Sequence, residues 1–343
     1  MEKAIPATVA PRGVSSGLKA VGFLVAQTRA ASFWLMRAGI LILYWGCLML
    51  ASFLPLRWSF GIARRIGRLT YWRRRRAVER EMATMGPRLG LTPEQTDSTA
   101  RRAFENASSE DLELCLYSRL SKENFGKLIE IRGLENISKA LNDGRGAILY
   151  SGHLRGFATL GATWGLLGYK VNHIDRGPRT ESREHPIDHC FYQWRRRVIQ
   201  DKPGIRFLLA SETNYSVALQ AAKALQRNEI VTVLIDLPLS KRTVEVDFLG
   251  MRATFPAGPA VIARSTGAPL LNFYVYRPHT WGPLVAEIGP PYHASQNLTV
   301  TMQHCASRLE ERILQHPADW ATWLFPNWNQ HLTPVATADH PQR

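Results

Sequence analysis

The chain has 343 residues, of which 45% are apolar and 10% aromatic. This is enough for a packed core in one large or two ordinary domains, and it excludes a disordered chain. A net charge of +15, from 43 Lys and Arg against 28 Asp and Glu, indicates an anionic partner: membrane lipid, nucleic acid or an acidic carrier protein. Four widely spaced cysteines without a C-x-x-C pair argue against a disulfide framework or a zinc site, and favour a reducing compartment.

An uncharged apolar run lies between Arg37 and Arg57, after a first segment, residues 1–30, that we expect to be loosely ordered. The run, residues 38–56, is just long enough to cross a bilayer core of roughly 30 Å. Its late start and the Pro and Arg that follow it argue against a cleaved signal peptide. We therefore predict an N-terminal membrane-anchoring helix; the alternative is a helix buried in the core.

Arginines are concentrated after the apolar run, and such a flank prefers anionic headgroups and the cytoplasmic side of a membrane. Apolar residues at helical spacing accompany them over residues 58–72, as in an interfacial amphipathic helix, with a solvated basic face as the alternative. No nucleic-acid-binding motif stands beside them, so we expect no nucleic acid partner. Residues 31–76 are thus predicted to form the anchor and a basic interfacial helix. The arginines are Arg57, Arg64, Arg65, Arg68, Arg73, Arg74, Arg75 and Arg76.

The remaining residues, 77–330, have the pattern of one α/β domain, followed by a loosely ordered tail at 331–343. Residues 77–125 are charged and periodic, which predicts two or three helices. Short β-rich runs then alternate with helical stretches, as in a mostly parallel central sheet flanked by helices. The expected strands are 128–132, 146–150, 170–174, 230–235, 270–276 and 284–288, and the expected helices are 157–167, 187–200, 215–226, 258–266 and 300–316.

His153 stands just after a predicted strand, at the edge of a parallel sheet where ligands bind. A neutral imidazole placed there can take a proton from a hydroxyl that attacks an ester or thioester, although a lone histidine in a turn can also be structural. Asp236 and Asp175 each follow another predicted strand, so either carboxylate can orient the imidazole from the same edge. For both carboxylates the alternative is a structural role, such as a helix cap or a salt bridge at Asp236.

A series of short motifs runs through residues 54–328. The motifs are Leu54-Pro55-Leu56-Arg57, the strand and turn that end in Gly152-His153, Leu167-Gly168-Tyr169, Val233-Leu234-Ile235-Asp236, Val246-Asp247-Phe248-Leu249-Gly250, Pro256-Ala257-Gly258-Pro259-Ala260, Thr266-Gly267-Ala268-Pro269 and Pro317-Ala318-Asp319-Trp320-Ala321-Thr322-Trp323. In this order they resemble the lysophospholipid acyltransferase superfamily and, within it, the bacterial lipid A late acyltransferases (lauroyl and myristoyl acyltransferases). The resemblance implies transfer of a fatty acyl chain from an acyl-carrier-protein or coenzyme A thioester to a hydroxyl of a membrane lipid.

The motif of the family it resembles is His, four residues, then Asp or Glu, and here Ala158 stands at the acidic position. The resemblance implies that His153 is the general base, and we expect Asp236 to replace the missing acid, because such a carboxylate orients the imidazole. Arg176 matches an arginine that the family uses near the reacting centre, where a guanidinium can bind a phosphate or help an oxyanion. The predicted substrate-binding residues are Gly152, Arg155 and Asp175; a solvated turn arginine is the alternative for Arg155.

We therefore expect a membrane-associated O-acyltransferase at the cytoplasmic face of a bacterial inner membrane. Its expected partners are acyl carrier protein or acyl coenzyme A as donor, a membrane glycolipid or lysolipid as acceptor, with a lipid A-type acceptor favoured, and an anionic membrane surface. No metal or redox cofactor is expected, since His185 and His189 fit an exposed or structural pair better than a metal site. The alternative is a catalytically degenerate protein that binds a lipid or an acyl carrier and assists envelope lipid assembly.

Overall fold

The computed structural model describes residues 35–117, 121–156, 164–175, 186–200, 204–209, 216–237, 242–279, 282–325 and 331–334. The predicted N-terminal segment, residues 1–30, and most of the predicted tail lie outside these ranges. Of the predicted helix at 157–167, the description covers only 164–167, where residues 164–166 are helical.

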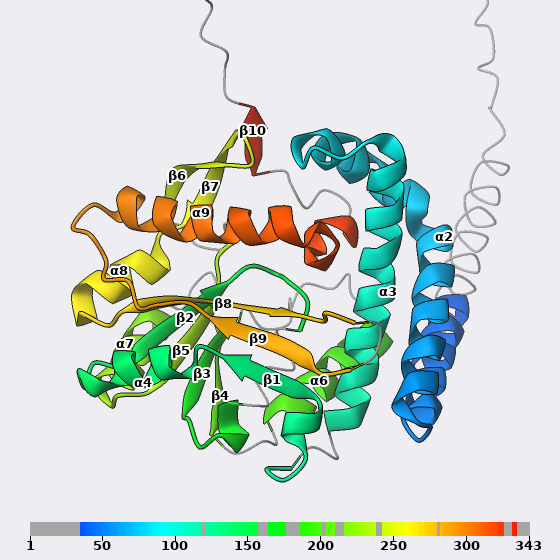
Figure 1. Ribbon diagram of the computed structural model, residues 1–343, viewed down its shortest axis with the longest axis horizontal. Coiled ribbons are helices and arrows are strands. Elements are labelled where there is room, and N and C mark those ends of the chain that lie inside the picture. The colour runs from blue at the N-terminus through cyan, green and yellow to red at the C-terminus, as the bar shows by residue number, and fades with distance from the viewer. Residues whose placement is uncertain are drawn as a thin grey trace, which may run out of the picture.

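A seven-stranded sheet forms the centre of the described structure (Figure 1). Its strand order is β1-β9-β8-β2-β5-β3-β4. Strands β8, β2, β5, β3 and β4 run parallel to one another, whereas β9 pairs antiparallel with β8 and parallel with β1. The prediction of a mostly parallel α/β sheet is confirmed. The strands are β1 (Ile129–Arg132), β2 (Ala147–Ser151), β3 (Val171–Asp175), β4 (Ile205–Leu209), β5 (Ile230–Leu234), β8 (Leu270–Tyr276) and β9 (Leu284–Ile288).

Helices cover both faces of this sheet because its strands are apolar on both sides, as expected for buried parallel strands. In β2, Ile148 and Tyr150 point into one core, whereas Ala147 and Leu149 point into the other. The first core is closed by α7 (Ser216–Gln226), α8 (Gly258–Thr266) and α9 (Leu298–Gln315), and the second by α4 (Leu134–Asn142). Another helix, α6 (Pro186–Gln200), contacts β4 and α3. The predicted strands, and the predicted helices at 187–200, 215–226, 258–266 and 300–316, agree with these bounds to within two residues.

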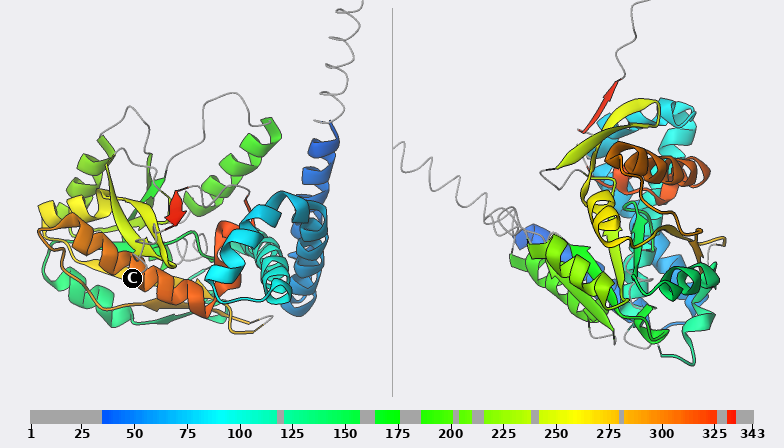
Figure 2. Two further views of the ribbon diagram at one scale, coloured as in Figure 1. Left: turned by 90° about the horizontal axis from the view of Figure 1, so that it is seen from above. Right: turned by 90° about the vertical axis from the view of Figure 1, so that its left-hand side faces the viewer.

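Two long helices, α2 (Leu56–Arg88) and α3 (Pro93–Tyr117), pack side by side at one end of the sheet (Figures 1 and 2). Gly67 permits this close approach, because its backbone lies directly over the α3 backbone at Phe104 and Glu105. The predicted interfacial helix and the first part of the region 77–125 belong to one continuous helix, so the expected boundary at residue 76 falls inside α2.

Residues 35–51 form a helix that precedes α2. One side of it packs into the protein, since Trp45, Leu48 and Ala51 are buried in a cluster with α2 and α3. Its Tyr44 hydroxyl donates a hydrogen bond of 2.7 Å to Asp111 of α3. Within the described residues, no helix combines the length and the apolar character needed to cross a membrane. The predicted spanning anchor is therefore not confirmed.

A small antiparallel sheet, which the sequence analysis did not predict, lies beside α9. It consists of β6 (Thr243–Phe248), β7 (Met251–Pro256) and β10 (Leu332–Pro334), in the order β10-β7-β6. Leu249 and Gly250 connect β6 to β7 with φ angles of 52° and 69°, as in a tight two-residue hairpin turn. Val246 and Phe248 point into the first core, so this hairpin extends the packing of α9.

Two glycines of α2 provide a matched test of the packing between α2 and α3. A Cβ at Gly67 would lie 2.4 Å from the Phe104 carbonyl oxygen and 2.6 Å from the Glu105 Cα. Gly67→Ala must therefore push the helices apart, and we expect it to lower the free energy of unfolding by about 1–3 kcal/mol. A Cβ at Gly61 would meet nothing within 4 Å, so Gly61→Ala should raise it by about 0.5–1 kcal/mol, because Ala is the better helix former. Denaturant unfolding in mild detergent measures the free energy of unfolding of both variants. Equal effects of the two substitutions would contradict the close approach of α2 and α3 at Gly67.

Candidate active site

The turn after β2 carries His153 at the carboxyl edge of the sheet. β2 ends at Ser151, and its register pairs Ser151 with Leu234 of β5. Ile235 directly follows β5, and its backbone N–H donates a hydrogen bond of 2.9 Å to the Ser151 carbonyl. His153 and Asp236 therefore leave two adjacent parallel strands at the same level, as the sequence analysis expected.

Asp236 contacts His153 through both of its carboxylate oxygens. The His153 Nδ1 lies 2.6 Å from Asp236 Oδ1, and the His153 backbone N–H donates to Oδ2 at 2.9 Å. The Asp236 side chain is 1% exposed, whereas that of His153 is 30% exposed. The pair thus has a buried carboxylate and an imidazole that reaches the surface, which is the arrangement of a histidine base with an orienting acid.

Trp320 holds the same carboxylate from a distant part of the chain. Its indole N–H donates to Asp236 Oδ2 at 3.1 Å, and the side chain is buried. From the sequence, Trp320 was expected to close the core, and this hydrogen bond was not predicted. With the two contacts from His153, it gives the carboxylate three N–H partners.

These contacts set the pKa of Asp236. Burial alone would raise it, because an apolar environment disfavours the charged carboxylate. The charge of His153 and the hydrogen bonds from His153 and Trp320 outweigh burial, so the pKa of Asp236 lies below its usual value of 3.8. The carboxylate is therefore ionised at neutral pH.

The segment around Trp320 also fixes the His153 turn through its backbone. Leu154 forms an isolated antiparallel bridge with Trp320. The Arg155 N–H donates to the Asp319 carbonyl at 2.9 Å, and the Ala321 N–H donates to the His153 carbonyl at 3.0 Å. The turn is held on both sides, by β5 and by residues 319–321.

Arg155, predicted to bind substrate, is 7% exposed and points into the protein. Its guanidinium forms an ion pair of 3.1 Å with Glu113 of α3, and it donates to the Asn106 side chain at 3.3 Å. Glu113 also forms an ion pair with Arg277. Burial and the nearby charge of Arg155 lower the pKa of Arg277. The described contacts thus give Arg155 a structural partner on α3, and the alternative of a solvated turn arginine is wrong.

Gly152 and Asp175 lie at the same edge of the sheet. A Cβ at Gly152 would come within 2.8 Å of the Leu309 side chain and 3.2 Å of Asp236 Oδ2, so Gly152 leaves room for the carboxylate. Asp175 ends β3, the strand that also carries His173. Burial lowers the pKa of His173 to about 4, although the nearby charge of Asp175 opposes this shift. This second imidazole is therefore neutral at pH 7, and it forms a hydrogen bond of 2.9 Å with the Thr232 hydroxyl.

Two positions of the predicted site fall outside the described residues. Arg176, the predicted anion binder, follows the last described residue of β3, and Ala158 lies just beyond the described His153 turn. Their predicted roles stay predictions. In the part of the chain that the structure describes, no group of three or more His, Cys, Asp or Glu side chains could hold a metal ion.

The fold and the site together define an α/β protein in which a buried aspartate hydrogen-bonds a histidine at the carboxyl edge of a parallel sheet. Residues 27–330 match the family model of the bacterial lipid A biosynthesis acyltransferases, so the chain belongs to this family and is an acyltransferase.

Curated relatives carry a related description. The chain is 27% identical over 236 residues to the phosphatidylinositol mannoside acyltransferase of Mycolicibacterium smegmatis, a match that covers 64% of this chain and 72% of that protein. It is 29% identical over 225 residues to the phosphatidylinositol mannoside acyltransferase of Mycobacterium tuberculosis, covering 63% of this chain and 66% of that protein. The chain thus spans about two thirds of the length of these relatives.

The lowered pKa of Asp236 predicts a dependence of stability on pH. A carboxyl whose pKa falls on folding stabilises the folded protein above its unfolded pKa of about 4, and this contribution is lost as pH falls through the folded value. We expect the free energy of unfolding to decrease as the pH is lowered below about 4. This decrease should be smaller in Asp236→Asn than in the wild type. Asp143→Asn, at an exposed side chain directly after α4, is the matched control and should keep the wild-type slope. Denaturant unfolding at a series of pH values measures how the free energy of unfolding changes with pH. Identical slopes for all three proteins would contradict the prediction.

Proposed function

We propose that this acyltransferase moves a fatty acyl chain from a thioester donor to a hydroxyl of a membrane lipid, with His153 as general base and Asp236 as its orienting carboxylate. The observation that carries the proposal is the 2.6 Å contact between His153 Nδ1 and the buried Asp236 Oδ1. A carboxylate at Nδ1 fixes the orientation and tautomer of the ring and stabilises the imidazolium that forms during proton transfer.

The reaction then follows from this geometry. With Nδ1–H donated to Asp236, the His153 Nε2 takes the proton of the acceptor hydroxyl as its oxygen attacks the thioester carbonyl. The tetrahedral intermediate collapses by breaking the carbon–sulfur bond, and the imidazolium returns its proton to the departing thiolate. The products are the lipid ester and the free thiol, and the histidine is restored without a cofactor.

Both the family description and the names of the relatives favour a glycolipid acceptor. Lipid A and phosphatidylinositol mannosides carry sugar hydroxyls, and we place the acceptor in this class, with a lipid A-type molecule as one member. Acyl carrier protein or acyl coenzyme A serves as donor in this proposal. Arg176 remains the proposed binder of an anion on one of the two substrates.

We place the protein at the cytoplasmic face of a bacterial inner membrane. Large apolar side chains on the helix at 35–51 and on the turn that follows it are exposed, which supports contact with a bilayer. They include Leu43 (68% exposed), Leu50 (73%) and Phe53 (73%). The arginines of α2 follow directly, as expected beside anionic headgroups.

A non-catalytic lipid- or carrier-binding protein is the second candidate. The alanine at position 158 favours it, because the resemblance places an acidic residue there. The contact between His153 and Asp236 favours an active enzyme instead, since the carboxylate is present on the adjacent strand.

Acyl transfer from a labelled acyl-carrier-protein thioester to extracted bacterial lipids tests the proposal. We expect His153→Ala and Asp236→Asn each to lower the rate by roughly 10³–10⁴-fold, because the base is removed or left without its orienting acid. Trp320→Phe removes one donor to Asp236 and should lower the rate on the order of 10–100-fold, because a hydrogen bond to a charged group contributes about 1.5–3 kcal/mol. Asp247→Asn is the matched control and should transfer at the wild-type rate.

Each failure of this assay has a separate meaning. A wild-type rate in Asp236→Asn would show that this carboxylate does not serve His153. No transfer by the wild-type protein from either thioester donor would make the non-catalytic binding protein the better proposal.

Vesicle cosedimentation without detergent tests the membrane contact. We expect the double variant Leu50→Asp with Phe53→Asp to bind neutral phosphatidylcholine vesicles more than about tenfold less tightly than the wild type, because two exposed apolar side chains no longer enter the bilayer. Leu219→Asp is the control, since Leu219 is 57% exposed on α7, away from the N-terminal helices. An equal loss of vesicle binding in the double variant and in Leu219→Asp would argue against a specific membrane-facing side of the protein.

A further inference from the structure

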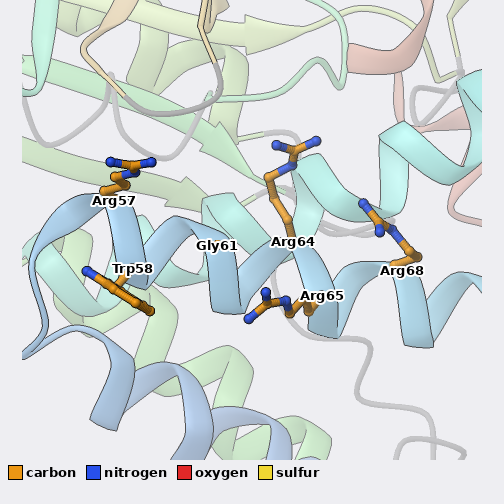
Figure 3. Close-up of a pocket in the computed structure, with 6 residues that line it drawn as sticks. All are labelled: Arg57, Trp58, Gly61, Arg64, Arg65 and Arg68. Carbon is orange, nitrogen blue, oxygen red and sulfur yellow. The ribbon is translucent and has the colours of Figure 1, made fainter.

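The N-terminal half of α2 carries a groove of about 520 Å³ (Figure 3). Four arginines, a tryptophan and a glycine line it: Arg57, Trp58, Gly61, Arg64, Arg65 and Arg68. In Figure 3, the side chains of Arg57, Arg64 and Arg68 lie along one side of the helix, and those of Trp58 and Arg65 along the other. The catalytic proposal uses none of these residues.

The spacing of these residues builds the groove. Positions 57, 61, 64 and 68 are separated by three, four, seven or eleven residues, so they share one face of α2, and Arg65 lies on the adjoining side with Trp58. At the middle of that face stands Gly61, where a Cβ would meet no atom within 4 Å. A glycine in a helix interior weakens the helix, and here it leaves the space between the arginines open.

Two of the arginines are fixed by one buried carboxylate. Arg64 and Arg68 both bind Glu105 of α3, at 2.9 Å and 3.0 Å, and the Glu105 side chain is only 6% exposed. The Arg64 and Arg68 side chains remain 36% and 52% exposed. This trio keeps a net positive charge in a defined position, and Arg57 and Arg65 add to that charge.

Apolar side chains border the arginines on the solvent side of the same helix. Trp58, Leu69 and Trp72 are 67%, 72% and 61% exposed, and on a helix they lie next to the arginine face. Exposed tryptophans beside arginines are characteristic of proteins at the interface between headgroups and acyl chains. A lipid surface would cover these apolar side chains while the neighbouring arginines meet its headgroups.

We infer that this groove is a binding site for the phosphate group of an anionic lipid headgroup. Guanidinium groups bind phosphate through paired N–H donors, and a pair held by Glu105 loses little freedom on binding. The inference rests on the proposed membrane association but is more specific than attraction to a charged surface. A pre-positioned site distinguishes phosphate from another anion of equal charge, whereas diffuse attraction does not.

The test measures binding to vesicles of phosphatidylcholine that contain either phosphatidic acid or oleate, matched for surface charge. We expect the wild-type protein to bind the phosphatidic acid vesicles on the order of tenfold more tightly than the oleate vesicles. Gly61→Glu places a carboxylate among the arginines and should abolish this preference. Gly61→Gln, of the same size without the charge, should retain it, because the groove is far larger than the added side chain. Unfolding curves confirm that both variants fold, as the open space at Gly61 leads us to expect.

Equal binding of the wild type to both vesicles, or equal behaviour of Gly61→Glu and Gly61→Gln, would overturn the phosphate site in favour of diffuse charge. If Gly61→Glu instead weakens binding of purified acyl carrier protein and leaves vesicle binding unchanged, the groove receives the donor and the lipid assignment is wrong. No acyl transfer is involved in these measurements. His153→Ala should bind as the wild type does, so failure of the catalytic proposal and failure of the phosphate site are distinguishable.

Discussion

The Asp236 carboxylate joins three parts of the chain that are distant in sequence. It follows β5, accepts hydrogen bonds from the backbone and ring of His153 after β2, and accepts a third from Trp320 near the C-terminal end of the domain. A buried carboxylate without such partners would cost several kcal/mol. The strand edge, the histidine turn and residues 317–323 therefore depend on one another, because removal of any one of them leaves the charge incompletely compensated.

A second set of buried charges extends this unit to the N-terminal helices. Glu113 of α3 binds Arg155 beside the histidine turn and also Arg277 after β8. The Arg277 guanidinium lies 4.3 Å from the centre of the Phe60 ring on α2. Buried ion pairs add little net stability, but loss of one partner is costly because the other charge stays buried. A continuous chain of contacts thus joins α2, which carries the arginine groove, to the turn that carries His153.

The sequence was sufficient for the elements with uninterrupted apolar runs or clear helical periods, such as β8 and α8, whose bounds were predicted to the residue. It was insufficient for the β6–β7 hairpin, although exposed Glu245 and Asp247 alternate with less exposed residues as in a half-buried strand. The usual hairpin signal is missing from the turn, because Leu249 stands where Asn or Asp is preferred and adopts a positive φ that its side chain does not favour. The meeting of His153 and Asp236 was predictable, because adjacent parallel strands end at one edge. The burial of Arg155 was not predictable, because its partner Glu113 lies 42 residues away on a helix. No local sequence pattern indicates such a pair.

Sheet register explains why a carboxylate that follows the neighbouring strand lies beside His153. The register pairs Ser151 with Leu234, and His153 and Asp236 each follow their strand partner by two residues. The distance between imidazole and carboxylate is therefore fixed by backbone hydrogen bonds of the sheet. A carboxylate at Nδ1 orients the imidazole of a general base, and in the proposed mechanism the register of β2 and β5 supplies that carboxylate from Asp236 and not from position 158.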